Sequence, residues 1–180
     1  MRLDFLIVGA MKAGTTSLGE WLGCSAHIAI PSKEIHYFNN NFEKGRDWYE
    51  RQLCLSDCNP KDVLIGEKTP SYSYVPCCAE RIHSEFPEVK IIWIFRDPIK
   101  RAFSNYLHAV KKGRERRSFE YCVLNESKRM KSNIFKGYCE RSKYDIQVEH
   151  FLKYFTIEQM HFLRFEEVVA DPKSSALKIF

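Results

Sequence analysis

The sequence predicts an α/β domain in which helices cover both faces of a central, mainly parallel sheet. Continuous apolar runs of strand length at 5–8, 63–65 and 91–95 are typical of strands that are covered on both sides. The segments between these runs repeat their apolar residues at three- and four-residue spacing, the pattern of helices packed on one face. With 180 residues, 44% of them hydrophobic, the chain is long enough for a complete core, so residues 1–180 are expected to form a single domain.

The first predicted strand ends in a glycine loop. Residues 9–17 read Gly-Ala-Met-Lys-Ala-Gly-Thr-Thr-Ser, and Leu18, Trp21 and Leu22 then follow at helical spacing. A strand, a tight loop and a helix start direct several backbone N–H groups and the positive end of the helix dipole at one spot. The stretch therefore predicts an anion-binding site. The alternative is a glycine turn whose lysine is only solvated.

The lysine of this loop stands at an unusual position. The common nucleotide-binding pattern G-x-x-x-x-G-K-[ST] would place a lysine after Gly9 and Gly14, but Thr15 occupies that position. The lysine comes earlier, as Lys12, and hydroxyl side chains follow at the helix start. We expect a three-layer fold of the P-loop type whose anion loop is lined by hydroxyl groups.

An acid and an imidazole follow the first helix. Apolar residues at 26–30 predict a short strand, and the alternation over 33–38 predicts an extended segment with Glu34 and His36 on one face. Such a pair can transfer a proton. The alternative is the edge of a surface strand with ordinary polar residues.

The middle of the chain places two more charged residues after a strand. Residues 44–55 have the spacing of a helix, and the strand at 63–65 is followed by Glu67 and Lys68. Ligands of open α/β sheets bind beyond the carboxyl ends of the strands, so these side chains are expected beside the first loop. A further helix ends at Pro87.

A second anion site is predicted where the strand at 91–95 ends. Arg96 follows the strand, Asp97 can cap the next helix and Pro98 can begin it. The apolar residues of this helix, expected to face the core, are Ile99, Ala102, Phe103, Tyr106 and Val110. Its less apolar face carries Arg101, Ser104 and Asn105. A guanidinium at the strand end matches a phosphate bidentately; the alternative is that Arg-Asp-Pro only starts a helix.

The last third of the chain completes the alternation of helices and strands. Helices are predicted over 118–131 and 137–155, a strand over 160–163 and a final helix from Pro172. The apolar stripe of the second helix is Tyr144, Val148, Phe151, Leu152 and Phe155.

Charge and composition exclude several classes of function. The net charge of +5 suits a polyanionic small ligand and falls short of a dedicated nucleic-acid binder. No stretch reaches 18 apolar residues and the seven cysteines lack metal-site spacing, so neither membrane insertion nor a structural metal is expected. Because Met1 stands four residues before the first strand, we expect no signal peptide, reduced thiols and a cytoplasmic location. A Golgi lumen is the alternative if the chain is a piece of an anchored enzyme.

Four motifs together resemble one enzyme family. They are Gly9-Ala-Met-Lys-Ala-Gly-Thr-Thr-Ser17, Lys33-Glu-Ile-His-Tyr-Phe38, Glu67-Lys-Thr-Pro-Ser-Tyr72 and Phe95-Arg-Asp-Pro-Ile-Lys-Arg-Ala-Phe-Ser104. Over nearly all of its length the chain is similar to sulfotransferases that use 3′-phosphoadenosine 5′-phosphosulfate (PAPS), in the branch of the heparan sulfate and bacterial small-molecule enzymes. In this family a basic, glycine-containing loop usually follows the equivalent of Phe180, so the chain is expected to lack the C-terminal part of the family domain.

The resemblance implies a role for each matching residue. Lys12 would neutralise charge on the oxygen that leaves the sulfuryl group, and Lys68 would lie near the transferring group. Glu34, with His36 beside it, would be the general base that takes the proton from a hydroxyl or amine of a small-molecule or carbohydrate acceptor, in an in-line displacement. The residues that would hold the 5′-phosphate are Lys12, Ala13, Gly14, Thr15, Thr16 and Ser17, and those that would hold the 3′-phosphate are Arg96 and Ser104. A fixed ammonium in a dry site stabilises the leaving oxygen, so no Mg²⁺ is expected to be required.

Two other functions are compatible with parts of the sequence. A P-loop kinase or NTPase predicts a lysine directly after Gly14 and an aspartate at the end of an apolar strand, where the sequence has Thr15 and Arg96. A non-catalytic nucleotide-binding module would keep the phosphate residues but lack Lys12 or Glu34, and both are present.

Overall fold

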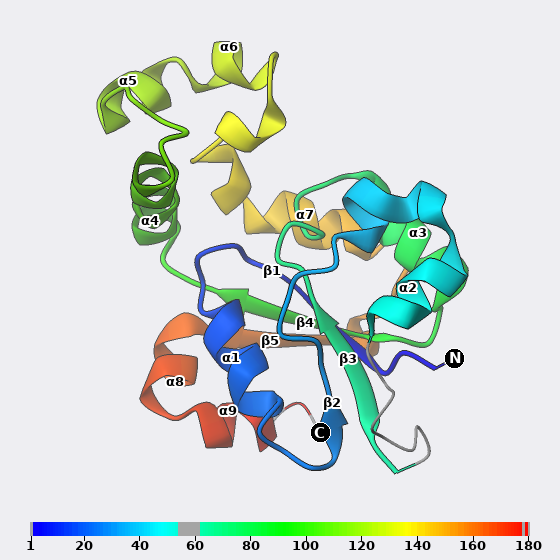
Figure 1. Cartoon of the computed structure of the whole chain (residues 1–180). Helices are drawn as coiled ribbons and strands as arrows, with labels where there is room; N and C mark the ends of the chain where they lie inside the picture. The colour runs from blue at the N-terminus through cyan, green and yellow to red at the C-terminus, as the bar shows by residue number, and fades with distance from the viewer. Residues whose placement is uncertain (1, 54–61, 178, 180) are drawn as a thin grey trace.

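The computed structural model describes residues 2–53, 62–177 and 179, which form three layers around one parallel sheet (Figure 1). The strands are β1 (Phe5–Gly9), β2 (Ile28–Ala29), β3 (Leu64–Lys68), β4 (Lys90–Phe95) and β5 (Met160–Arg164), in the spatial order β2-β3-β1-β4-β5. All neighbouring strands run parallel. The predicted α/β class with a central parallel sheet is confirmed.

Helices cover both faces of the sheet. The helices on one face are α2 (Arg46–Gln52), α3 (Cys77–Glu85) and α7 (Tyr144–Phe151). Those on the other face are α1 (Thr15–Leu22), α8 (Phe165–Ala170) and α9 (Pro172–Leu177). Successive side chains of a strand point to opposite faces, so β1 supplies Leu6 to the first core and Ile7 to the second. The continuous apolar runs of β1 and β4 are the consequence of this double burial.

The strand order reverses at β1. The chain adds β3 and β2 on one side of β1, and β4 and β5 on the other. In open α/β sheets, the crevice outside the carboxyl ends at such a switch point holds the ligand. The loops that leave β1 and β4 therefore mark where a site is expected.

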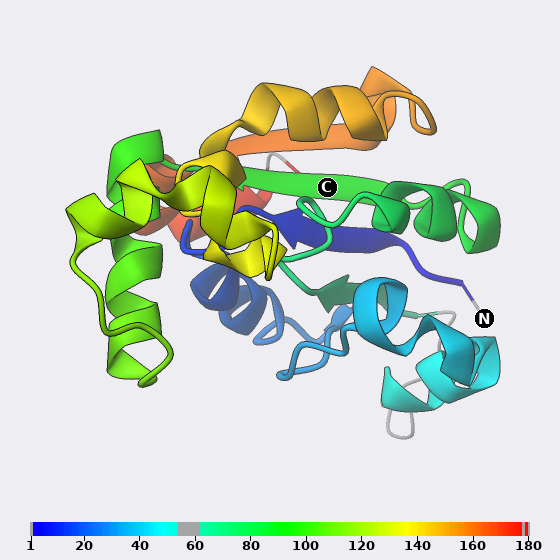
Figure 2. The ribbon, with the colours of Figure 1, turned by 90° about the horizontal axis from the view of Figure 1, so that it is seen from above.

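A helical lobe stands beyond the carboxyl ends of β1 and β4 (Figure 1, Figure 2). It consists of α4 (Pro98–Lys111), α5 (Phe119–Leu124), α6 (Glu126–Met130) and the 3-10 turns η3 (Ile134–Lys136) and η4 (Glu140–Ser142). Its own apolar core is small and centres on Ala102, Cys122 and Tyr138. The helix predicted over 118–131 is confirmed as the two short helices α5 and α6, which meet at Asn125.

The predicted buried face of α4 is wrong for most of its residues. Ile99 is 75% exposed, and Phe103 and Val110 are exposed as well. Arg101 and Asn105 are buried instead. The reason is that α4 leaves the sheet rather than lying along it, so its apolar stripe does not meet either core (Figure 1).

The extended segment predicted over 33–38 is also wrong. Residues 33–36 have no regular secondary structure, and the π-helix η1 (Tyr37–Asn41) follows. Tyr37 and Phe38 are both fully buried in the same core. An extended chain would send neighbouring side chains to opposite faces, so this shared burial requires the backbone to coil.

The helix predicted over 137–155 is shorter than expected. Only Tyr144–Phe151 forms α7, and the preceding residues turn through η4. Tyr138 and Arg141 are buried in the lobe, away from the stripe that faces the sheet. Of that stripe, Phe151 and Phe155 are buried, whereas Leu152 is 44% exposed.

The remaining predictions are mostly confirmed, with changed boundaries. The strand predicted over 26–30 shortens to β2, and β3 extends to Lys68, so Glu67 and Lys68 lie within the strand rather than beyond it. The helix over 44–55 is confirmed as α2, preceded by the 3-10 turn η2 (Phe42–Lys44). Its predicted end, together with Cys54 and Cys58, lies outside the described residues.

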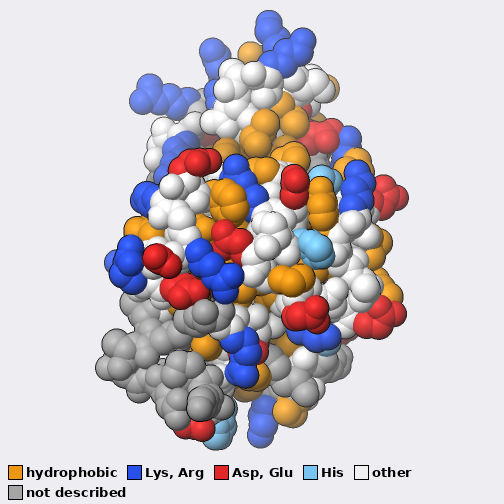
Figure 3. All heavy atoms as spheres, turned by 90° about the vertical axis from the view of Figure 1, so that its right-hand side faces the viewer, with side chains coloured by type: hydrophobic (Ala, Val, Ile, Leu, Met, Phe, Trp, Pro, Cys, Tyr) orange, Lys and Arg blue, Asp and Glu red, His pale blue; other side chains and the backbone are white. Residues whose placement is uncertain are grey.

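The surface and the cysteines can be compared with the features expected of membrane spans and metal sites. Acidic and basic side chains are interspersed on the side that carries α2 and α3 (Figure 3). No described helix is long and apolar enough to cross a bilayer. The described cysteines are all free thiols, and within the same residues no cluster of metal-ligating side chains forms.

Candidate active site

The loop between β1 and α1 has the backbone of an anion cradle. Gly14 lies in the left-handed region (φ 84°) directly before Thr15, and Lys12 lies there too (φ 69°). The positive φ favours glycine at this position, and a Cβ built on Gly14 would also lie tightly against the Phe165 ring, at 3.1 Å. Gly14 has no side chain to cap α1, and the first N–H groups of the helix are available to an anion.

Arg96 comes from the end of β4 and turns back to this loop. Its Nη1 donates a hydrogen bond to the carbonyl oxygen of Lys12 (2.9 Å), and its guanidinium stacks over the Phe165 ring at 4.4 Å. Its Nε is buried and has no hydrogen-bond partner among the described residues. A buried donor without a partner is costly, so Arg96 holds an N–H group ready for a ligand.

One cavity of about 360 Å³ gathers residues from both predicted anion motifs, and we call it the anion cavity. The sequence-predicted site residues that line it are Lys12, Gly14, Thr15, Thr16, Glu34, Arg96 and Ser104. Ala13 is buried in the core, and Ser17 is exposed outside the lining. The cradle and the strand end thus meet in one space.

Lys12 faces a histidine that the sequence reasoning missed. Lys12 Nζ lies 3.5 Å from His108 Nδ1. Burial lowers the pKa of Lys12, and the charge of Arg96 lowers it further, while Glu34 opposes both. Burial and then the charge of Lys12 lower the pKa of His108, so its imidazole is mainly neutral at pH 7 and can accept from the ammonium. The available signal was its position one helical turn after Ser104.

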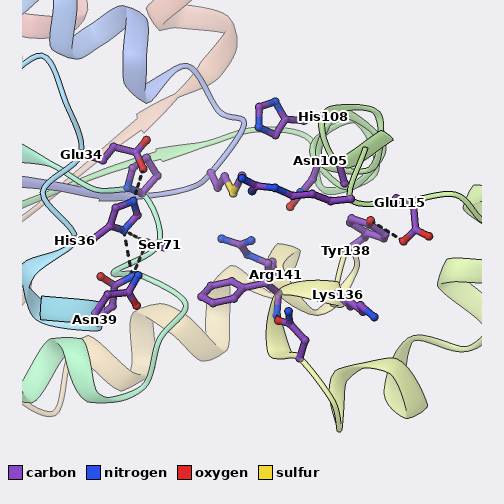
Figure 4. Close-up of a pocket in the computed structure, with 17 residues that line it drawn as sticks. Glu34, His36, Asn39, Ser71, Asn105, His108, Glu115, Lys136, Tyr138 and Arg141 are labelled. Atoms are coloured by element: carbon purple, nitrogen blue, oxygen red, sulfur yellow. Dashed lines mark hydrogen bonds and ion pairs between the residues drawn. The ribbon is translucent and has the colours of Figure 1, made fainter. Parts of the chain in front are cut away.

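Glu34 and His36 form a pair, as predicted, although not on a strand. His36 Nε2 lies 3.2 Å from Glu34 Oε2. The other ring nitrogen, Nδ1, faces Asn39 Nδ2 at 3.3 Å and Ser71 Oγ at 3.4 Å (Figure 4). The hydrogen bond with Glu34 raises the pKa of His36 above its ordinary value, although burial opposes it.

A second cavity of about 580 Å³, which we call the large cavity, adjoins the first. The Glu34 and His36 side chains lie on one side of it, and those of Lys136, Tyr138 and Arg141 lie on the other (Figure 4). The two cavities share the lining residues Met11, Glu34, Pro70 and His108. Glu34 therefore stands at the junction of the two spaces.

The far wall of the large cavity carries a buried cation. Arg141 is 4% exposed, and its guanidinium lies between the rings of Tyr74 (5.0 Å) and Phe135 (5.3 Å). Its Nη2 has no hydrogen-bond partner among the described residues. Burial and then the neighbouring charge of Arg101 lower the pKa of Arg141 to about 10. A cation this unfavourably placed is suited to an anionic ligand.

The acid of the same wall is already neutralised. Glu115 pairs with Arg129 and accepts a hydrogen bond from Tyr138 Oη (3.1 Å). Burial acts to raise the pKa of Glu115, but the hydrogen bonds from Arg129, the backbone of Arg117 and Arg116, and Cys122 together outweigh it and hold the pKa at about 2. The free charges of this wall are therefore positive.

Three residues expected in the site are placed differently. Lys68 is buried and packs against α1, where a Cβ on Gly19 would lie 3.1 Å from its Cδ; it lines neither cavity. Arg101 uses its donors internally: Nε bonds Ser142 Oγ (2.6 Å), Nη1 bonds Met11 O (3.4 Å) and Asn105 Oδ1 (3.2 Å), and Nη2 bonds Tyr138 O. Arg101 and Asn105 are therefore structural, not part of the anion site.

The comparisons with known proteins agree with this fold. The chain belongs to the sulfotransferase family, because the family model "Sulfotransferase domain" matches residues 2–180. The predicted resemblance is confirmed at the level of the family.

Two curated relatives carry names from heparan sulfate chemistry. The chain is 32% identical over 174 residues to heparan sulfate glucosamine 3-O-sulfotransferase 5 of Mus musculus, covering 93% of this chain and 49% of that protein. It is 30% identical over 177 residues to heparan sulfate glucosamine 3-O-sulfotransferase 3B1 of Homo sapiens, covering 93% and 42%. The chain thus spans about half the length of the curated relatives it matches, or less.

Solved structures share the fold. A crystal structure of a sulfotransferase from Alicyclobacillus acidocaldarius is similar with a TM-score of 0.83 and 30% identity, covering 96% of this chain and 76% of that one. The sulfotransferase domain from the curacin biosynthetic pathway has a TM-score of 0.63 at 17% identity, covering 98% and 71%, which is a likeness of fold alone.

Proposed function

We propose that this chain is a PAPS-dependent sulfotransferase domain that moves a sulfuryl group to a hydroxyl or amine. One observation carries the proposal. Glu34, a potential base, stands where an anion cavity and a larger, positively charged cavity meet. A transfer between two bound molecules needs such a junction.

The anion cavity fits the two anionic ends of PAPS. The β1–α1 cradle, with Lys12, Gly14, Thr15 and Thr16, would hold the 5′-phosphosulfate, as helix N-termini hold phosphates. Arg96, with its unpartnered Nε, and Ser104 would hold the 3′-phosphate. When bound, PAPS supplies the sulfuryl group.

The residues at the junction would divide the chemistry. Glu34 would take the proton from the acceptor's hydroxyl or amine, and the His36 ring at 3.2 Å would hold that carboxylate in place. Lys12 lines the anion cavity but not the large one, so its ammonium would act on the leaving side. A base toward the acceptor and a cation toward the leaving oxygen suit an in-line displacement. Lys68 lines neither cavity, and we assign it no role.

The large cavity would hold the acceptor. Its wall carries Arg114, Lys136 and Arg141, and the guanidinium of Arg141 lacks a protein acceptor among the described residues. This chemistry suits an acidic carbohydrate or small molecule, in accordance with the relatives named for heparan sulfate.

Calorimetry with 3′-phosphoadenosine 5′-phosphate, the donor without its sulfuryl group, tests the proposal. We expect this bisphosphate to bind in the presence of EDTA as well as with Mg²⁺, and ATP to bind more weakly. Loss of binding on chelation, or stronger binding of ATP, would favour a kinase or NTPase. Mass spectrometry of acidic carbohydrates incubated with PAPS and the protein should then show products heavier by one sulfuryl group. Absence of any product despite tight bisphosphate binding would favour a non-catalytic binding module.

A further inference from the structure

A carboxyl group lies fully buried beneath the Glu34–His36 pair. Glu67 in β3 has no exposed surface. It accepts hydrogen bonds from two hydroxyl groups: Tyr49 Oη donates to its Oε2 (3.1 Å), and Thr69 Oγ1 donates to its Oε1. Burial raises the pKa of Glu67 to about 7, although these hydroxyls oppose it. A group this costly to bury is expected to have a use.

The Thr69 hydroxyl and that of the neighbouring Tyr72 also reach the backbone that carries His36. Thr69 Oγ1 accepts a hydrogen bond from the N–H of His36 (3.3 Å). Tyr72 Oη accepts one from the N–H of Tyr37 (2.8 Å). A hydroxyl has one proton, and Thr69 gives its proton to Glu67, so its lone pairs are left to accept the backbone N–H. By accepting the hydroxyl proton, the Glu67 carboxyl group leaves Thr69 Oγ1 as an acceptor for the backbone N–H of His36.

The backbone at this point needs to be held. His36 has φ 56°, in the left-handed region that a residue with a Cβ adopts at a cost. It directly precedes η1, and no side chain of its own caps that helix. Thr69 and Tyr72 instead accept the backbone N–H groups of His36 and Tyr37 at the start of this helix.

We propose that Glu67 is a positioning residue, which acts through the hydroxyl of Thr69 to fix the backbone of His36 so that the Glu34–His36 pair faces the cavity junction. This inference rests on the catalytic role proposed for that pair. It assigns Glu67 no contact with either substrate, because Glu67 lines neither cavity. Glu67 and Thr69 together therefore hold the backbone of His36 from inside the core.

Thr69→Val tests the relay most cleanly, because it removes the hydroxyl and keeps the shape and Glu67. The readout is the titration of His36 by NMR, which needs no acceptor; a His36→Asn variant assigns the signal among the six histidines. In the variant, His36 should drift from Glu34 and its raised pKa should fall toward the ordinary value. Turnover should fall about fivefold to tenfold, the order expected from one lost buried hydrogen bond. Affinity for 3′-phosphoadenosine 5′-phosphate should stay within about twofold.

Two control variants separate the relay from packing and from charge. Thr69→Ser keeps the hydroxyl and should restore the wild-type titration. Tyr49→Phe removes a donor to Glu67 that does not touch the His36 backbone, and should leave the titration unchanged. Glu67→Gln, where it folds, should act in the same direction as Thr69→Val.

Three results would overturn the inference. They are a wild-type titration in Thr69→Val, an equal shift in Thr69→Ser, and an equal shift in Tyr49→Phe. Failure of the wild-type protein to bind the bisphosphate would instead count against the proposed function, and the His36 titrations of Glu67→Gln and Thr69→Val would still decide whether Glu67 positions the pair.

Discussion

The anion cavity and the large cavity meet at Glu34 but are built in different ways. The anion cavity is formed where strands end, by the loop after β1 and by Arg96 after β4. The far wall of the large cavity is formed by turns between 133 and 141, which no strand supports. The anion cavity combines the backbone N–H groups of a helix start with Lys12 and Arg96, whereas the large cavity contains Arg141, a buried cation held between two aromatic rings. On the proposed function, donor recognition would be a property of the sheet and acceptor recognition a property of the lobe.

The largest expected effect comes from Glu34, which lines both cavities. Glu34→Gln keeps the shape and removes the basicity, so kcat should fall by a factor of roughly 10² to 10⁴, while the dissociation constant of the bisphosphate stays within about threefold. Steady-state kinetics and calorimetry measure the two quantities. Lys12→Ala is the matched variant. It should lower kcat and also weaken bisphosphate binding, because the Lys12 ammonium lies inside the anion cavity. A Glu34→Gln protein that keeps more than about a third of the turnover would end the assignment, and His36 would be tested next.

The next effect is confined to the anion cavity. Arg96→Ala should weaken bisphosphate binding by roughly 1.5–3 kcal/mol, about tenfold to hundredfold, since it removes a charge-assisted contact. The control is Arg114→Ala, which alters only the large cavity and should bind the bisphosphate normally. Calorimetry measures the bisphosphate affinity of both variants. A variant that unfolded more easily but bound normally would show that Arg96 only starts α4.

A smaller effect is expected in the large cavity, where removing a charged side chain should stabilise the protein. The pKa of Arg141 is lowered to about 10, so folding disfavours its charged form. Arg141→Met should therefore raise the melting temperature by about 2–4 °C, equal to about 1 kcal/mol for a chain of this size, and raise KM for an acidic acceptor. Arg101→Met should instead lower the melting temperature, because Arg101 is fully hydrogen-bonded. A loss of stability in Arg141→Met would mean that the contacts with Tyr74 and Phe135 outweigh the buried charge.

The smallest effect is the pH dependence of the pair at the junction. Because the folded-state pKa of His36 is raised, the pair stabilises the protein fully below the unfolded pKa of about 6.5, and this stability is lost as the pH rises through the folded value. Both side chains are more than a third exposed, so the contribution is less than about 1 kcal/mol. Denaturant unfolding should show a smaller decrease from pH 5.5 to 8.5 in Glu34→Gln than in wild type. The raised pKa of Glu67 also makes stability fall as the pH rises, but it does so in both proteins and cancels from the comparison.

The anion cavity could be predicted from short motifs because its parts are local. A strand, a glycine turn and a helix start are adjacent in the chain, and Arg96 follows a strand that must lie beside the first. Glu34 and His36 were also placed together by their two-residue spacing. The structure keeps the pair but forms it by coiling at η1 instead of extending the chain.

The large cavity could not be predicted because its wall depends on contacts between distant segments. The apolar stripe of α4 predicted a buried face, but burial depends on where the helix points, and α4 points away from the sheet. Arg141 shows no signal in the sequence, since its burial results from Tyr74 and Phe135 packing around it. His108 was within reach of prediction, because its position follows from Ser104 once the helix is known.

The internal role of Arg101 has a consequence for the size of the acceptor. Its guanidinium donates to the carbonyl of Met11, which lines both cavities, and to the carbonyl of Tyr138, in the far wall of the large one. A guanidinium is a flat, rigid group whose span does not adjust as apolar packing does. On the proposed function, this rigid group would tie the loop that holds the donor to the wall that faces the acceptor. Acceptors of different sizes would then meet the same spacing between the two.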